Sequence, residues 1–349
     1  MDFFEWSISV QIPIIYLTIC MTFPSMAIYI AQIVTIVRHK KFHNSFYGLF
    51  VMRAILDLLY VMDSFYGNRL PLIIGAVLYP IYSNLPNWML AMLLLIDGQT
   101  FFANYLVTAF ILLNRLTAII MPINHEKIWQ KCLPFITIFV YFVPTLLFLP
   151  MLKMNTILIL NSPNSTTDRS FFIYEAGDAS YINNSIYACT VFSVIFLVLC
   201  VLLNIGTFVA YKLHLMKVGV NGNNEYLIGK KLLIYALTTF LGHALIASLF
   251  LINIITDTGN TKTVRILYIY YPLLMDTGTV VLSSWLLLWA SGTFRQQLIK
   301  DFTIIRKTNI QNNRVDAMDG PRNNNHRAVG GAVGQQFQNS SVNQLPKVA

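Results

Sequence analysis

The stretch 97–122, DGQTFFANYLVTAFILLNRLTAIIMP, decides the fold of this chain. Its charges stand near its two ends, Asp97 at one and Arg115 at the other, and the residues between them are mostly apolar. At a helical rise of about 1.5 Å per residue, these charges are about 27 Å apart, close to the thickness of a bilayer's hydrocarbon core. The wider segment 90–120 is therefore predicted to be a membrane-spanning helix, with one end open to a ligand and the other to a partner.

The composition of the whole chain has the same character. Of 349 residues, 56% are hydrophobic and 11% are charged, whereas about 25% of the residues in a soluble domain are charged. These values predict an all-α integral membrane protein whose main partner is the lipid bilayer. The net charge of +9 does not indicate nucleic acid, because Lys and Arg collect in the cytosolic loops of membrane proteins.

Seven apolar runs are each long enough to cross a bilayer. The segment 70–82 is also apolar, but it is short and punctuated by prolines, so it is not predicted to cross. The expected architecture is a seven-transmembrane helix bundle over residues 1–302, with spans at about 11–37, 45–66, 90–120, 133–151, 185–211, 232–254 and 266–290.

The distribution of Lys and Arg predicts the orientation of these spans. The four pieces 38–45, 115–132, 212–231 and 294–349 hold 3, 3, 4 and 8 of them, which makes 18 of 24. The other side holds five, namely Arg69, Lys153, Arg169, Lys262 and Arg265. Because basic residues favour the cytosolic side, we expect a multi-pass plasma-membrane protein with its N-terminus outside.

The loop 153–184 is then extracellular, and it carries two glycosylation acceptor patterns, at Asn164 and Asn183. Asn164 is the better candidate, since Asn183 stands close to the fifth span. Two runs rich in β-branched and aromatic residues, 156–160 and 171–174, flank a turn-like segment and predict a hairpin.

The cytosolic end of the chain contains two further segments. Apolar residues share one helical face of 294–302, with basic residues beside them, which is typical of a short helix on the inner membrane surface. The segment 303–349 is rich in Asn, Gln and Gly and is predicted to be a disordered tail. None of the four cysteines stands clearly in an outer loop, so no structural disulfide is expected.

Ionisable residues inside spans are costly and mark candidate sites. Arg53 and Asp57 are four apart in the second span, so they share a face and can pair; Asp57 is either simply neutralised by Arg53 or part of a conformational switch. Asp97, with Phe101 one turn below, is either a carboxylate wetted from outside or a ligand anchor with an aromatic wall. The ligand-binding candidates are Asp97, Phe101, His243 and Asp276.

Arg115 is the candidate contact for a cytosolic partner, and its alternative role is that of an anchor reaching the membrane interface. The sequence contains no His-Glu-x-x-His, Gly-x-Ser-x-Gly or phosphate-binding Gly-rich motif. We therefore expect no catalytic residues, no metal site and no cofactor.

Several short motifs resemble those of known receptors. The spacing of Asn114-Arg115-Leu116, Ile119 and Pro122 is similar to the signature that ends the third helix of rhodopsin-like receptors, although Asn114 stands where an acid is usual. The order of Ser45-Phe46-Tyr47, then 113–122, then Glu126-Lys127-Ile128-Trp129 most closely resembles the nematode serpentine chemoreceptors of class gamma, with class V as the near alternative.

This resemblance implies a rhodopsin-like seven-helix chemosensory receptor in the membrane of a sensory cilium. It would bind an extracellular small molecule and signal to a heterotrimeric G protein, with Arg115 and Asp57 on the switching side. The alternative function is a membrane transporter or an odorant-gated channel. Transporters usually contain internal repeats, which the two halves of this sequence lack, and insect odorant channels have the opposite orientation.

Overall fold

A computed structural model describes residues 10–161, 169–176, 179–218 and 270–303, together with isolated residues between 234 and 251. The chain forms two compact units, Met1–Asp301 and Phe302–Ala349. Asn164, His243 and most of the expected span 232–254 lie outside the described residues.

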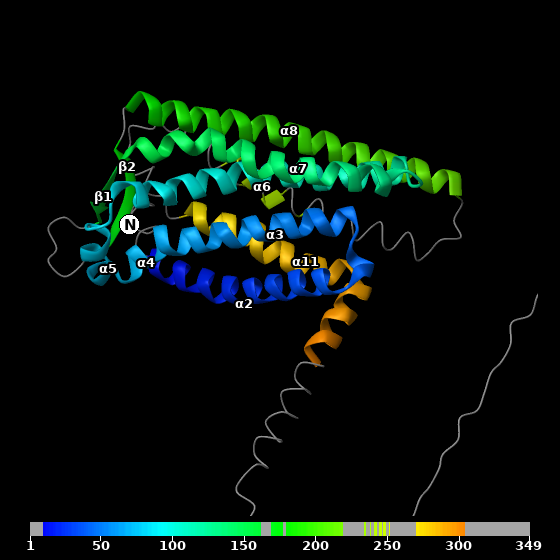
Figure 1. Cartoon of the computed structure of the whole chain (residues 1–349), viewed down its shortest axis with the longest axis horizontal. Helices are drawn as coiled ribbons and strands as arrows, with labels where there is room; N and C mark the ends of the chain where they lie inside the picture. The colour runs from blue at the N-terminus through cyan, green and yellow to red at the C-terminus, as the bar shows by residue number, and fades with distance from the viewer. Residues whose placement is uncertain are drawn as a thin grey trace, which may run out of the picture. The chain divides into compact units, whose positions relative to one another are not determined.

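Six of the described helices are long and apolar enough to cross a membrane. In the first unit they run side by side as a bundle (Figure 1). The chain is thus an all-α membrane protein. The helices are α2 (Gln11–Arg38), α3 (Ser45–Ser64), α6 (Asn87–Ile120), α7 (His125–Phe148), α8 (Ala179–Val218) and the segment 270–290, which includes η4 (Thr277–Val281) and α11 (Leu282–Ala290).

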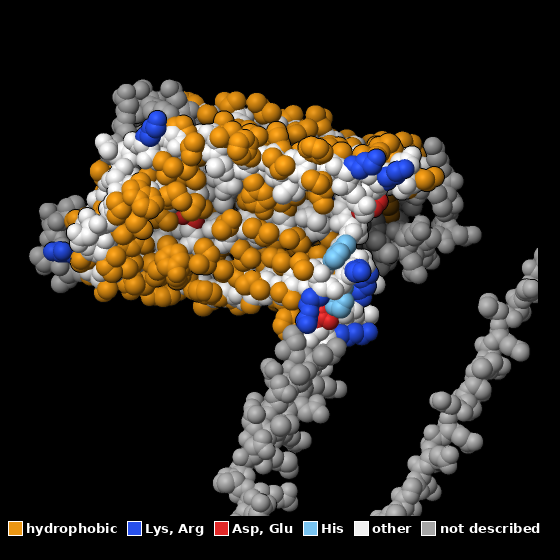
Figure 2. All heavy atoms as spheres, in the orientation of Figure 1, with side chains coloured by type: hydrophobic (Ala, Val, Ile, Leu, Met, Phe, Trp, Pro, Cys, Tyr) orange, Lys and Arg blue, Asp and Glu red, His pale blue; other side chains and the backbone are white. Residues whose placement is uncertain are grey.

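The helix α6, which contains the stretch 97–120, lies at the centre of the bundle. It packs against α3, α7 and α8. Half of its most apolar window is buried inside the protein, compared with 17% for α7. Both α7 and α8 carry many exposed hydrophobic side chains. Hydrophobic side chains also cover the face of the bundle seen in Figure 2. A surface of this kind suits hydrocarbon rather than water.

One end of the bundle, called the hairpin end below, carries an antiparallel hairpin. Strand β1 (Asn155–Leu160) pairs with β2 (Phe171–Ala176), which confirms the predicted hairpin. The segment 70–82 forms two short helices at the same end, α4 (Leu70–Ile73) and α5 (Gly75–Tyr82) (Figure 1). Gly75 allows the hairpin to approach α5, since a Cβ there would lie 2.5 Å from Cα of Ser170.

Two helices differ from the expected spans. The second one does not end at residue 66 but continues through a π-helical segment, η2 (Phe65–Arg69), into α4. The assignment of Arg69 to an outer loop is therefore wrong: its side chain is buried within the bundle, where it pairs with a carboxylate. The fourth helix, α7, begins at His125, on the loop side of the expected start at residue 133.

The opposite end, called the basic end below, carries exposed Arg and Lys side chains, visible in Figure 2. Residues 292–303 are helical there, and Phe294 and Leu298 are buried, whereas Ile299 and Phe302 are exposed. The Phe294 ring lies 5.1 Å from that of Phe42 in η1 (Lys40–Phe42). The exposed basic residues at this end include Arg38, Lys40, Lys41, Lys127, Lys131, Arg295 and Lys300.

Candidate functional site

Arg53 and Asp57 form an ion pair in the interior of the bundle. Nε of Arg53 lies 3.6 Å from Oδ2 of Asp57, and both side chains are fully buried. The hydroxyl of Tyr29 donates a hydrogen bond of 2.9 Å to the same oxygen, which ties α2 to α3. The predicted pairing is confirmed. Because an unpaired buried charge would cost several kcal/mol, Asp57 compensates Arg53 in this conformation.

A second buried ion pair joins the two π-helical segments. Arg69, the last residue of η2, donates to Asp276, which immediately precedes η4. The hydroxyl of Thr22 also donates to Asp276, over 3.2 Å. Asp276, a ligand-binding candidate, therefore already has a cation and a hydroxyl as partners. π-helical turns often occur at functional sites because they re-aim side chains.

A close approach of backbones accompanies η4. A Cβ added to Gly242, one of the described residues of the expected span 232–254, would lie 3.1 Å from Cα of Gly278. Small residues at such a contact allow membrane helices to pack closely. Gly242 thus lies directly beside Gly278 of η4.

Asp97 and Phe101 lie on α6 in the hairpin half of the bundle. Phe101 is buried, and its ring centroid lies 4.7 Å from that of Tyr105 and 6.5 Å from that of Tyr271. Asp97 is only partly buried. It lies close enough to Tyr271 to interact with it electrostatically. Phe101, one helical turn from Asp97, therefore belongs to a group of aromatic rings.

Asp63 and Tyr60 are two further polar residues at this place that the sequence reasoning missed. Asp97 lies close enough to both of them to interact electrostatically, and Tyr60 also interacts with Asp276 and Arg69. Both side chains are buried on α3, and neither Oδ1 of Asp63 nor the hydroxyl of Tyr60 has a hydrogen-bond partner among the described residues. The sequence did contain a signal for Asp63, because it is the third charged residue, after Arg53 and Asp57, within the expected span 45–66.

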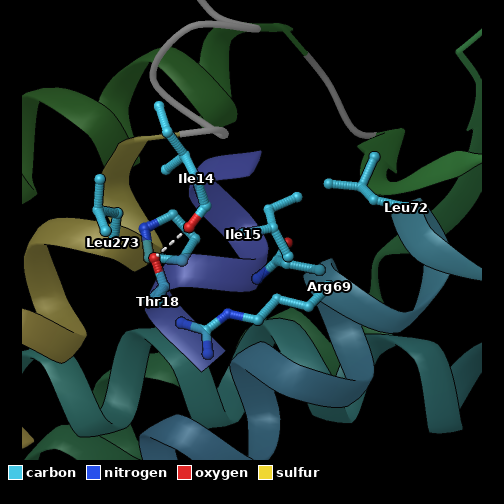
Figure 3. Close-up of a pocket in the computed structure, with 8 residues that line it drawn as sticks. Ile14, Ile15, Thr18, Arg69, Leu72 and Leu273 are labelled. Carbon is cyan, nitrogen blue, oxygen red and sulfur yellow. Dashed lines mark hydrogen bonds between the residues drawn. The ribbon is translucent and has the colours of Figure 1, made fainter. Parts of the chain in front are cut away.

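A small cavity lies between α2, η2 and the segment that begins at Tyr270 (Figure 3). Arg69 and the apolar side chains of Leu72 and Leu273 line it. The hydroxyl of Thr18, also in its wall, is already bonded to the carbonyl of Ile14 over 2.8 Å. Its volume of about 20 Å³ suits one water molecule. An organic ligand needs a larger site than this one.

At the basic end, three separate sequence motifs meet in one hydrogen-bonded group, which we call the basic-end cluster: Ser45, Asn114, His125 and Glu126. The side chain of Asn114 donates to the Ser45 hydroxyl over 3.0 Å. The hydroxyl and backbone N–H of Ser45 each donate to the Glu126 carboxylate over 2.8 Å. Nε2 of His125 lies 3.0 Å from the carbonyl of Asn114. The starts of α3 and α7 are thereby joined to the end of α6.

Arg115 lies beside this cluster. Its guanidinium is stacked on the ring of Phe46, 4.9 Å from the ring centroid, and the residue is 8% exposed. Trp129 donates a 2.8 Å hydrogen bond to the hydroxyl of Thr117, two residues beyond Arg115 on α6. Arg115 is thus packed against Phe46 of α3 rather than extended toward the solvent.

The helix at 292–303 is fastened to the same end by polar contacts. Nε2 of His39 lies 2.9 Å from Oδ2 of Asp301, and Gln297 donates to Oδ1 over 2.9 Å. Lys41 donates to the side-chain oxygen of Gln297 over 2.7 Å. Desolvation alone would raise the pKa of Asp301, but the hydrogen bonds from Gln297 and His39 outweigh it and lower that pKa below its usual value.

The candidate residues therefore fall into three groups. Asp97 and Phe101 lie on α6 toward the hairpin end. Asp57 and Asp276 are in the interior, where each pairs with an arginine. Arg115 lies at the basic end. Asn183 falls within α8, near its start. All four cysteines are free.

A bundle of membrane-length helices with internal ion pairs and polar clusters at both ends has the architecture of a serpentine, rhodopsin-like seven-transmembrane receptor. The comparison with protein families agrees: the family described as Srg family chemoreceptor matches residues 15–298. The chain belongs to this family of serpentine chemoreceptors, class gamma. No curated protein matches it.

Proposed function

We propose that this chemoreceptor binds an extracellular small molecule at the hairpin end of its bundle and signals to a heterotrimeric G protein at the basic end. The observation that carries the proposal is that Asp97 is partly exposed and forms no salt bridge among the described residues. Asp57 and Asp276, in contrast, are occupied by Arg53 and Arg69. Ligand anchoring therefore falls to Asp97 and Phe101, with His243 as a further candidate.

The route from the ligand to the cytosolic side would run along α6. This helix carries Asp97 near one end and Arg115 near the other, and it packs against three neighbours. A ligand changes such a bundle only if it binds one of its two states more tightly. In the inactive state Arg115 is packed on Phe46; in the active state its planar donors would meet the backbone of the G protein.

The orientation proposed with this function has the N-terminus and the hairpin outside the plasma membrane, in a sensory cilium. The split of Lys and Arg between the two sides supports it. Moving Arg69 into the bundle leaves four basic residues outside, namely Lys153, Arg169, Lys262 and Arg265, against 18 on the other side. The acceptor sites Asn164 and Asn183 would then meet the glycosylation machinery.

Arg115 provides the test of the proposed signalling. In cells that express the receptor, with a second-messenger readout and a screen of small molecules, Arg115→Ala should keep surface expression and ligand binding but lose the response. Arg115→Lys should restore it only in part, because Lys lacks the planar fork of donors.

The control for a general effect of charge is Lys127→Ala, an exposed basic residue in the first turn of α7, which should respond like the wild type. If Arg115→Lys signals as strongly as the wild type, Arg115 is only an interfacial anchor and its role in signalling is refuted.

A further inference from the structure

Two segments that are far apart in the sequence bring basic residues together at the basic end. The end of α2 and the turn after it carry Arg38, Lys40 and Lys41, and the helix at 292–301 carries Arg295 and Lys300. All five residues are exposed, and we call them the juxtamembrane basic patch. Figure 2 shows Lys and Arg side chains gathered where this helix leaves the bundle.

A polar contact joins the two segments of the patch. Nε2 of His39 lies 2.9 Å from Oδ2 of Asp301. His39 stands between Arg38 and Lys40 in the sequence, and Asp301 directly follows Lys300. The contact therefore brings cations of both segments close to the same point.

Gln297 forms a second link between the segments. Its side-chain oxygen accepts a 2.7 Å hydrogen bond from Nζ of Lys41, and its amide nitrogen donates over 2.9 Å to Oδ1 of Asp301. The rings of Phe42 and Phe294 also pack edge to face, 5.1 Å apart. These contacts hold like charges near one another, which is unfavourable unless an anion offsets their repulsion.

The patch has little negative charge of its own. Residues 38–44 and 291–301 contain five Lys and Arg but one carboxylate, Asp301, which leaves a formal charge of +4 with the histidines neutral. None of the five cations forms a salt bridge among the described residues. The patch can therefore bind an anion without displacing a carboxylate from any of them.

Exposed apolar side chains stand beside these cations. Val37 precedes Arg38 and is 62% exposed, and Ile299 precedes Lys300 and is 59% exposed. Apolar side chains next to Lys and Arg are typical of segments at the boundary between lipid headgroups and acyl chains. This position favours an anion that the membrane itself carries.

We propose that the juxtamembrane basic patch binds the headgroup of a phosphoinositide, a membrane lipid with several phosphates on one ring. Each Lys or Arg beside a membrane contributes about fivefold to the affinity for anionic lipid. A headgroup with two ring phosphates can contact both segments of the patch at once, whereas phosphatidylserine carries one net charge. This inference goes beyond the proposed function and concerns neither the extracellular ligand nor the G protein.

The test uses the full-length receptor, purified in detergent and titrated with short-chain lipids. Native mass spectrometry measures the fraction of receptor that carries phosphatidylinositol bisphosphate, phosphatidylserine or free inositol trisphosphate, because the three differ in mass. We expect the bisphosphate lipid to bind at least about tenfold more tightly than either of the others, since it combines several charges with acyl chains.

Charge variants then locate the site. Lys40→Gln and Lys300→Gln should each weaken binding of the bisphosphate lipid by about fivefold. Lys40→Arg and Lys300→Arg keep the charge and should bind it like the wild type. Lys131→Gln is the matched control, because Lys131 is an exposed lysine of α7 at the same end, and it should leave binding unchanged.

A pair of uncharged variants tests whether the links between the segments build the site. Gln297→Ala removes both of its hydrogen bonds without altering the charge, and it should weaken binding by about 2- to 10-fold, the usual value of a hydrogen bond. The preference for the bisphosphate over phosphatidylserine should fall by the same factor. Gln296→Ala, at the exposed neighbouring position, should change neither quantity.

Four outcomes would overturn the proposal. Phosphatidylserine could bind as tightly as the bisphosphate, which would leave only a general attraction to anionic membranes. Free inositol trisphosphate could bind as tightly as the lipid, which would assign the patch to a soluble phosphate. Lys131→Gln could weaken binding as much as Lys40→Gln and Lys300→Gln, or Gln297→Ala could behave like Gln296→Ala.

These measurements are separate from the test of the proposed function. No extracellular ligand or G protein is present in the samples, so a failure of signalling leaves the lipid site standing. A receptor that signals normally but shows any of these four outcomes refutes the lipid site alone.

Discussion

At the scale of single residues, Glu126 holds the start of α3 with both of its oxygens. One oxygen accepts the backbone N–H of Ser45 and the other accepts its hydroxyl. A carboxylate at this position also interacts favourably with the N-terminal end of the helix dipole. The bonds cross between α3 and α7, so Glu126 joins two helices that a ligand-driven movement would have to separate.

Glu126→Gln should therefore destabilise the resting arrangement. We expect it to lower the free energy of unfolding by about 1 to 2 kcal/mol, since it removes charge-assisted hydrogen bonds, and to raise basal signalling. Ser45→Ala should act in the same direction. In a double-mutant cycle on thermal unfolding, the two changes should couple by at least about 0.5 kcal/mol.

Gln130→Ala is the matched control, because Gln130 donates to Glu126 from an exposed position and contributes little to a bond between helices. Additive effects of Glu126→Gln and Ser45→Ala would contradict the linkage between them.

The two buried ion pairs differ in how far the sequence could predict them. Arg53 and Asp57 are four residues apart on one helix, so the helical repeat alone brings them together. Arg69 and Asp276 are separated by 207 residues. Their meeting depends on the register of two π-helical segments and on the packing of two helices. No local pattern in the sequence encodes either of these.

At the scale of elements, a glycine sets the distance between α6 and α7 beside Asp97. A Cβ added to Gly98 would lie 2.3 Å from Cε1 of Phe148. The ring of Phe148 therefore occupies the space that a side chain at position 98 would need, and it also lies 5.2 Å from the ring of Phe102.

Gly98→Ala should push Phe148 away and destabilise the protein by about 1 to 3 kcal/mol, the usual cost of overpacking. The measurement is thermal unfolding of the purified receptor. Adding Phe148→Leu should recover part of the loss, because the smaller side chain vacates the contested space. An Ala variant as stable as the wild type would show that α6 and α7 can move apart freely.

Prediction from sequence was most successful for elements whose pattern is local. The hairpin was predicted from two β-branched runs around a turn, and both strands form. The helical continuation through η2 was not predicted, since Gly67 and Asn68 resemble a loop in composition. In the structure this segment is helical, and its last residue, Arg69, pairs with Asp276.

At the scale of the whole molecule, the two ends of the bundle differ in charge. With single cysteines introduced into a cysteine-free receptor, Ile157→Cys in the exposed hairpin should react with a membrane-impermeant thiol reagent applied outside intact cells. Lys131→Cys at the basic end should react only after permeabilisation. The reason is the excess of Lys and Arg at that end, which favours the cytosol. Equal labelling from outside would refute the proposed orientation.

Glycosylation provides a second test of the proposed orientation in the membrane. A mobility shift on a gel that disappears in Asn164→Gln would agree with an external hairpin. Asn183→Gln and the double variant would separate the contributions of the two acceptor sites. A receptor made in glycosylating cells without any shift would count against this orientation.

The 207 residues that separate Arg69 from Asp276 along the sequence have a consequence for biosynthesis. The ribosome adds about 5 to 20 residues each second, so the guanidinium leaves the exit tunnel about 10 to 40 s before its carboxylate does. During that interval the nascent chain carries a cation in its second helix without its final counterion. A chain released early, by a nonsense codon before residue 276, never acquires that counterion. The last helix to be inserted therefore completes the electrostatics of the second.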